Sequence, residues 1–87
     1  MMNRFMLTVS SPDGNLFKGE AVKLTLRGAM GDLAVLAGHT PFITSVQSGE
    51  CHIYITDDEV KNATTEGGLL SVADNTVTFL TGRFNWI

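Results

Sequence analysis

Cysteine is almost absent from this chain of 87 residues, because Cys51 is the only one. A single thiol cannot form an internal disulfide, and it cannot build a zinc site that needs four thiolate ligands. A long apolar run is missing too: no stretch approaches the roughly 18 residues that a membrane-spanning helix requires, and Thr and Ser interrupt the apolar amino end. We therefore expect a protein of a reducing compartment that is neither secreted nor membrane-spanning by itself.

Charge is scarce as well. Charged residues make up 17% of the chain, and nine acidic against six basic residues give a net charge of −3. The basic residues are scattered rather than clustered: Arg4, Lys18, Lys23, Arg27, Lys61 and Arg83. Nucleic acids and anionic membrane surfaces attract clustered positive charge, so neither is predicted as a partner. With 44% hydrophobic residues, the composition is that of one folded domain over residues 1–87.

Long uninterrupted segments are missing, because nine glycines and two prolines cut the chain into short pieces. Within the pieces apolar and polar residues alternate with period two, as in residues 5–10 and 22–27, which is typical of strands with one face on a core. The longest stretch free of Gly and Pro, residues 50–66, alternates in the same way and is rich in Thr, Ile and Val. We predict no helix.

The pattern predicts an all-β protein of about nine or ten short strands, arranged as a two-sheet antiparallel sandwich or flattened barrel. Hairpin turns are expected at residues 57–58 and 74–75, and a tight turn or bulge at residues 67–68. The predicted core consists of the inward positions of the alternating pieces: Leu7, Val9, Val22, Leu24, Leu26, Leu33, Val35, Ile53, Ile55, Val77 and Phe79.

His39 is the first candidate for chemistry, in the stretch GDLAVLAGHTPFI of residues 31–43. A general base would need a nucleophile or substrate pocket and an orienting partner, and spacing reveals neither. Gly38 permits a backbone bend, while Pro41 fixes its own φ and pushes Thr40 into an extended conformation. These residues favour a stiff loop, pinned by the His39 ring, that presents side chains to a partner. A small hydrolase or metal protein built around His39 remains the least favoured alternative.

The other candidates also have structural explanations. Cys51 and His52 are adjacent strand residues that point to opposite faces, so we expect Cys51 in the core and His52 on the surface. The acidic residues 57–59 are better explained as solvent-exposed residues of a hairpin turn than as calcium ligands. Met30 is expected to be exposed at a contact. The sequence therefore predicts no catalytic residue, no cofactor and no metal.

Residues 31–53, GDLAVLAGHTPFITSVQSGECHI, resemble the signature of the epsilon subunit of F-type ATP synthases, which typically reads Gly-Glu-Leu-Gly-Ile-Leu-Pro-Gly-His-Ala-Pro-Leu. Upstream, LTVSSPDGNLFKGEAVKLTLRG is similar to the opening strands of that family. Downstream, EGGLLSVADNTVTFL is similar to its double glycine and closing hairpin. The likeness covers nearly the whole chain. Ala34 and Ala37 depart from it, standing where the family usually has Gly and Pro.

The resemblance implies a β-sandwich at the foot of a rotating central stalk, holding the gamma subunit on one side and the ring of c subunits below. Such a subunit has no active site or cofactor, and it couples proton or sodium flow to ATP synthesis or hydrolysis. It lies on the cytoplasmic side of the plasma membrane, peripherally, through the complex only. The residues and the resemblance together predict the partner-binding set Ser10, Ser11, Met30, Gly31, Asp32, Gly38, His39, Thr40 and Pro41.

Within this set, Asp32 stands at the acidic position of the family loop that faces the ring, and His39 matches the family histidine. Ser10 and Ser11 match the end of the first strand, close to the stalk contacts. We expect residues 28–32 and 38–41 to be neighbouring loops. An alternative is an adaptor sandwich that uses the loops of residues 28–41 on an unrelated protein.

One family feature is not found in this sequence. Family members of ordinary length continue into two carboxy-terminal helices that can bind ATP or block rotation, whereas this chain stops at NWI. The expectation is therefore an epsilon-like amino-terminal domain without the helical hairpin, either as a short subunit or as a fragment of a longer one.

Overall fold

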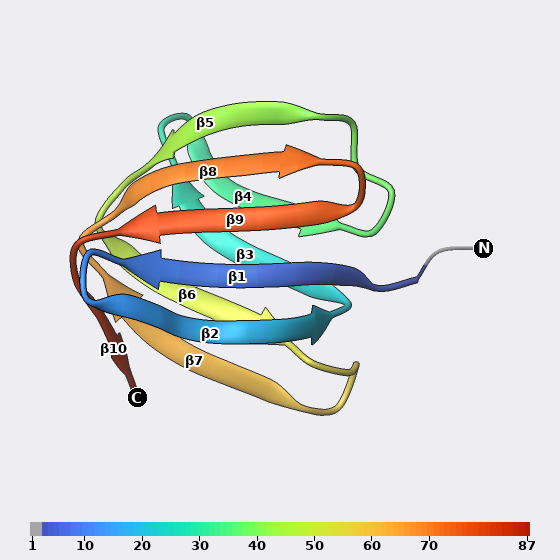
Figure 1. The fold of residues 1–87 in the computed structure, drawn as a ribbon, viewed down its shortest axis with the longest axis horizontal. Helices are drawn as coiled ribbons and strands as arrows, with labels where there is room; N and C mark the ends of the chain where they lie inside the picture. Colours follow the sequence, from blue (N-terminus) through green and yellow to red (C-terminus); the bar gives the residue numbers. More distant parts are fainter. Residues whose placement is uncertain (1–2) are drawn as a thin grey trace.

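The structure, a computed structural model, describes residues 3–87, and within that range it is built of strands with no helix (Figure 1). No helix able to cross a membrane occurs in this part of the chain. The ten strands are β1 Phe5–Ser11, β2 Gly14–Ala21, β3 Lys23–Gly28, β4 Gly31–Leu36, β5 Phe42–Val46, β6 Gly49–Tyr54, β7 Val60–Thr65, β8 Gly68–Ala73, β9 Thr76–Thr81 and β10 Phe84–Trp86. The all-β prediction is confirmed.

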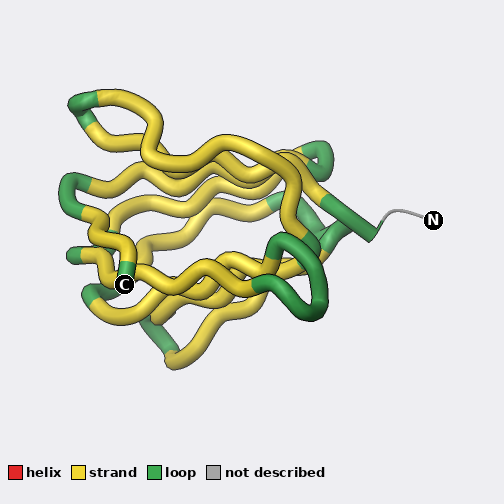
Figure 2. The backbone as a smooth tube through the Cα atoms, turned by 90° about the horizontal axis from the view of Figure 1, so that it is seen from below, coloured by secondary structure: helices red, strands yellow, loops and turns green. Residues whose placement is uncertain are grey.

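The strands form two packed layers, as Figures 1 and 2 show. Hydrogen bonds connect the strands in the order β10-β7-β6-β3-β5-β8-β9-β1-β2, and β4 pairs with β3. We call β5, β8, β9, β1 and β2 the front sheet, and β4, β3, β6, β7 and β10 the back sheet. The predicted flattened barrel is therefore correct, with one feature that alternation cannot reveal: β1 and β9 pair in parallel, and the other pairs are antiparallel.

The core lies between the two layers. Of the predicted core, all positions but Val22, Leu33 and Ile55 are buried. These three are only partly buried: Val22 lies in the connection between β2 and β3, Leu33 is on the edge strand β4, and Ile55 follows the end of β6. Alternation correctly predicts that these three side chains face the core, but it does not predict how close they lie to the rim of the sandwich. The core also contains residues outside the prediction: Phe5, Ala21, Val46, Ala63, Leu70, Val72 and Phe84.

The carboxy-terminal strand β10 packs against β7 and closes one open side of the sandwich. Phe84 is buried, and its ring meets the Trp86 ring edge to face at 5.0 Å between centroids. Trp86 also reaches across to Phe17 of β2 at 6.2 Å. Aromatic pairs of this geometry stabilise by roughly 0.5–1.5 kcal/mol beyond the area that they bury.

The predicted turns are confirmed. Asp74 and Asn75 have φ of 50° and 58° and connect β8 to β9 as a two-residue hairpin, a turn that requires positive φ at both positions. Between β6 and β7, the Thr56 hydroxyl accepts hydrogen bonds from the Asp58 and Glu59 amides at 3.2 and 3.0 Å. Gly67 has φ of 98°, and a Cβ there would collide with the Val46 carbonyl, so the chain turns tightly at this point.

Two buried threonines link the two turns at which the chain passes from one sheet to the other. Thr65 and Thr81 are the buried polar residues of the described chain, and their hydroxyl oxygens lie 2.8 Å apart. The Thr81 hydroxyl donates to the Gly67 carbonyl at 2.7 Å, and the Thr65 hydroxyl oxygen accepts from the Gly67 amide at 3.1 Å. The Arg83 carbonyl lies 3.1 Å from both hydroxyls. The pair thus ties the β7–β8 turn to the β9–β10 turn.

We predict that Thr81→Val lowers the free energy of unfolding by about 1–3 kcal/mol, because it keeps the side-chain volume but leaves the buried Gly67 carbonyl without its donor. Urea unfolding followed by tryptophan fluorescence measures the loss. Thr64→Val, at an exposed position of β7 next to Thr65, is the control and should change stability by less than about 0.5 kcal/mol. Equal stability of the Thr81 variant and the parent would contradict the role of the pair.

Candidate functional site

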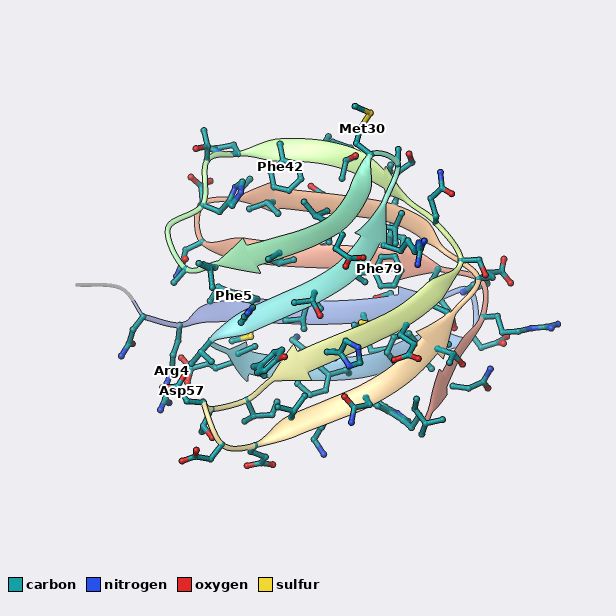
Figure 3. All side chains as sticks on the ribbon, turned by 180° about the vertical axis from the view of Figure 1, so that it is seen from behind. Arg4, Phe5, Met30, Phe42, Asp57 and Phe79 are labelled. Carbon is teal, nitrogen blue, oxygen red and sulfur yellow. The ribbon has the colours of Figure 1, made fainter. Side chains whose placement is uncertain are left out.

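The two predicted binding loops lie at opposite ends of the sandwich. The turn between β3 and β4 carries Met30, and the loop of residues 37–41 follows the other end of β4 (Figures 1 and 3). A six-residue strand spans about 20 Å at roughly 3.3 Å per residue. The expectation that residues 28–32 and 38–41 are neighbours is therefore wrong, because a strand connects the two segments rather than a turn.

The β3–β4 turn projects fully into solvent. The Met30 side chain is 101% exposed, and Figure 3 shows it at the tip of the hairpin. Gly31 has φ of 126°, and a Cβ on Gly28 would lie 2.9 Å from the Gly31 carbonyl oxygen, so the turn is tight enough to need glycine. Asp32 is exposed and pairs in register with Arg27 on the outer face of the back sheet. Met30 is thus exposed as the sequence predicts.

Ser10 and Ser11 lie at the same end of the sandwich as Met30, but on the front sheet. The Ser10 hydroxyl donates to the Asn15 side-chain oxygen at 2.8 Å. The Ser11 hydroxyl oxygen accepts from the Asp13 amide at 3.2 Å, which shapes the β1–β2 turn. Both serines line a hollow that residues 66–68 and 80–82 complete. This end therefore brings together Ser10, Ser11 and the turn that precedes Asp32.

The His39 side chain and local backbone hydrogen bonds stabilise the shape of the loop of residues 38–41. Gly38 has φ of 75°, and the His39 amide donates to the Leu36 carbonyl at 3.3 Å. The His39 ring Nδ1 lies 2.9 Å from the Thr40 carbonyl oxygen, and the ring packs on Phe42 at 4.7 Å between centroids. A carbonyl only accepts, so Nδ1 carries the proton of this bond and Nε2 is left available to a partner. The predicted pin of the loop by His39 is present.

A large uncharged surface covers the outer side of β5, β8, β9 and β1 in the front sheet, and we call it the neutral face. The remaining strand, β2, carries Lys18 and Glu20 beside Thr8 and Met6 on this side. The cross-strand registers place the side chains of the neutral face in rows across β5, β8, β9 and β1. They are Ile43, Ser45, Leu69, Ser71, Ala73, Thr76, Thr78, Leu80, Met6, Thr8 and Ser10. The large apolar members Met6, Ile43, Leu69 and Leu80 are 41–69% exposed. Ser10 apart, the sequence prediction missed this surface, although the lack of charge at alternate positions of these strands is visible in the sequence.

The outer side of the back sheet is charged. Lys23 and Arg27 of β3 and Glu50 of β6 line a shallow hollow with Asp32. In the same hollow, His52 Nε2 lies 3.3 Å from a Glu50 carboxylate oxygen. The neutral face and the outer face of the back sheet therefore differ in charge. Burying the back face in a contact would desolvate several charges, whereas burying the neutral face would desolvate none.

Cys51 and His52 lie on opposite sides of β6, as predicted. Cys51 is fully buried, and burial raises the pKa of its thiol to about 12. His52 Nδ1 faces the Asn62 side-chain oxygen at 2.6 Å. Within residues 3–87, no three side chains of the types His, Cys, Asp or Glu gather as a metal site would require. His39 therefore belongs to no such cluster within the described residues.

The family model of the ATP synthase Delta/Epsilon chain, beta-sandwich domain, matches residues 4–87. The chain belongs to this family. The resemblance seen in residues 31–53 is thereby confirmed, and it extends over nearly the whole sandwich, including β7, which lies between β6 and β10.

Relatives in this ATP synthase family carry the name epsilon chain. The epsilon chain of Desulfitobacterium hafniense is 39% identical over 80 residues, which cover 92% of this chain and 60% of that protein. The epsilon chain of Acetobacterium woodii, described as sodium ion specific, is 34% identical over 86 residues, 99% of this chain and 65% of that protein. The chain thus spans less than two thirds of the length of these relatives.

Solved structures of ATP synthases share the fold. A chain of the Euglena gracilis mitochondrial ATP synthase superposes with a TM-score of 0.91 at 20% identity, covering 99% of this chain and 55% of that one. A chain from the central stalk and c-ring of the Tetrahymena thermophila enzyme gives a TM-score of 0.77 at 14% identity, covering 91% and 63%. At these identities the likeness describes the arrangement of the strands.

We predict that Cys51 of the folded domain reacts with a thiol reagent at least about 100-fold more slowly than Cys51 of the unfolded chain, because only the thiolate reacts and burial both raises the pKa and blocks access. Ellman's reagent at pH 8, with and without urea, measures the two rates. A native rate close to the unfolded rate would show that β6 opens readily and that the core is not as described.

Proposed function

We propose that the chain is a non-catalytic, epsilon-like subunit of the central stalk of an F-type ATP synthase. It joins the gamma subunit to the c-ring and so helps to couple ion translocation to ATP synthesis or hydrolysis. The observation that carries the proposal is the neutral face, because a free-standing domain has no need of such a surface. The family membership and the names of the relatives support the identity of the partners.

The gamma subunit is assigned to the neutral face. Interfaces form where the burial of apolar side chains is favourable and no charge loses its water. Ile43, Leu69 and Leu80 supply exposed apolar area, while serine and threonine hydroxyls between them can bond to a polar partner. Thr40 and Pro41 lead directly into β5, so the loop of residues 38–41 borders this face and is assigned to the same partner.

The c-ring is assigned to the end that carries Met30. The exposed Met30 offers a flexible apolar contact, and Asp32 follows it on the rim with Gly31 between them. Charges on the rim of an interface influence partner choice and association rate more than folding. Ser10 and Ser11 lie where this end meets the neutral face. The two assigned partners then contact adjoining parts of one rigid sandwich.

A subunit with these contacts is held peripherally at the cytoplasmic side of the plasma membrane through the complex, and protons or sodium ions are the translocated ions. Co-purification from native membranes tests the assignment: the chain should be recovered with a gamma subunit and c subunits. Recovery with an unrelated protein instead would favour the adaptor function.

We predict that Ile43→Lys weakens binding to the gamma subunit of the same enzyme at least about tenfold, because the interface would have to bury an unpaired ammonium group. Titration calorimetry or surface plasmon resonance measures the affinity. Val60→Lys places the same charge at an exposed apolar position of the back sheet and is the matched control. Both variants should keep the parental unfolding midpoint. Equal loss of affinity in the two variants would contradict the choice of face.

We predict that Asp32→Arg folds normally and binds gamma as before, but associates poorly with the ring. An exposed ion pair contributes only about 0–1 kcal/mol to stability, whereas like charges across an interface can cost several kcal/mol. In a reconstituted complex, the variant should couple ion flow to ATP turnover less tightly. Asp58→Arg, with the same charge change at the other end of the sandwich, should behave as the parent. If Asp32→Arg assembles and couples normally, the assignment of the ring to this end is wrong.

A further inference from the structure

The Asn75 side chain connects three segments that are far apart in the sequence. Its side-chain oxygen accepts a hydrogen bond from the Gly38 amide at 2.8 Å, across 37 residues. Its side-chain nitrogen donates to the Arg4 carbonyl at 2.6 Å, across 71 residues. In addition, the backbone carbonyl of Asn75 accepts from the Met6 amide at 3.2 Å. One residue of the β8–β9 turn thus holds both the loop of residues 38–41 and the start of β1.

The two partners fix the orientation of the amide group. An amide N–H only donates and a carbonyl oxygen only accepts, so the oxygen of Asn75 must face Gly38 and its nitrogen must face Arg4. A carboxylate at this position could keep the bond to Gly38 but not the bond to Arg4. The two bonds can therefore be separated by one substitution.

The hydrogen bond from the Gly38 amide to Asn75 connects the loop of residues 38–41 to a distant part of the chain. In the described chain, the other hydrogen bonds of residues 37–41 join neighbours: the His39 amide to Leu36, and the His39 ring to Thr40. These local bonds give the loop its shape but do not determine its direction relative to the front sheet. The bond from Gly38 to Asn75 does so, because Asn75 closes the β8–β9 hairpin of that sheet.

The hairpin itself does not need the Asn75 side chain. Positive φ at both turn positions is satisfied by Asp-Gly as well as by Asp-Asn, and Asp-Gly is a preferred sequence for this turn. The side chain is partly buried and makes both of its bonds outside the hairpin. Its contribution is therefore to its neighbours.

We propose that Asn75 is a positioning residue for partner binding: it orients the loop of residues 38–41, and with it the free Nε2 of His39, relative to the neutral face. The proposal rests on the proposed function, in that the loop and the face bind one partner, gamma. Asn75 itself need not touch gamma.

Three variants separate this role from a general effect on stability. Asn75→Gly keeps the turn and removes both side-chain bonds. Asn75→Asp also tolerates the left-handed conformation and keeps the acceptor for Gly38, but it loses the donor to Arg4. Asp74→Asn changes the charge of the neighbouring turn position and leaves both bonds intact. Each variant is compared with the parent chain by amide hydrogen exchange, urea unfolding and affinity for gamma.

The expected result is a divergence between stability and binding. Protection of the Gly38 amide should fall about two- to tenfold in Asn75→Gly and be retained in Asn75→Asp and Asp74→Asn. Affinity for gamma should fall about two- to tenfold in Asn75→Gly only, although both Asn75 variants lose the bond to Arg4 and are less stable.

Unchanged Gly38 protection in Asn75→Gly would overturn the positioning of the loop, and so would an affinity for gamma that follows stability, equally weak in both Asn75 variants. Unchanged affinity in Asn75→Gly despite lost protection would overturn the link to binding. If the parent chain itself does not bind gamma, the proposed function fails together with the link to binding, while the exchange measurement still decides whether Asn75 positions the loop.

Discussion

The parallel pairing of β1 with β9 is the contact on which the rest of the sandwich depends. In the strand order, β1 and β2 are joined to the front sheet through this pair alone. Its register places Leu7 beside Val77 and Val9 beside Phe79 on the buried side, and Met6, Thr8 and Ser10 on the neutral face. The same pairing therefore completes the core and extends the surface assigned to gamma.

A parallel contact between distant strands is costly to form, because no short turn can bring the two segments together. Here the hydrogen bonds of Asn75 reach the backbone of Arg4 and of Met6, and Met6 is the first residue of β1 that pairs with β9. The β8–β9 turn thus makes hydrogen bonds both to the start of β1 and to the Gly38 amide. Asn75 therefore bonds to both the amino end of the chain and the loop of residues 38–41.

The division of charge between the two outer faces has a simple origin. Each strand presents one face to the core, and its alternate positions are free to carry any polar residue. Along β5, β8, β9 and β1 these positions hold no charge, whereas β3, β4 and β6 hold Lys23, Arg27, Asp32 and Glu50. Solubility of the isolated domain would be served by charge on both faces. An uncharged surface over these four strands fits the proposed place of the domain in a complex.

The sequence by itself determined the strands, the side of each residue and the family. Alternation was sufficient for residues such as Leu7 or Phe79, because a strand has only two faces, and local chemistry was sufficient for the Asp74-Asn75 turn and the His39 pin. Only the tertiary structure decided which strands distant in the sequence lie together, such as β1 beside β9. It placed Met30 and His39 at opposite ends and assembled the neutral face from four strands. It also gave Asn75 partners 37 and 71 residues away. These are relations between distant segments, and local pattern carries no information about them because they arise from the pairing order of the whole sheet.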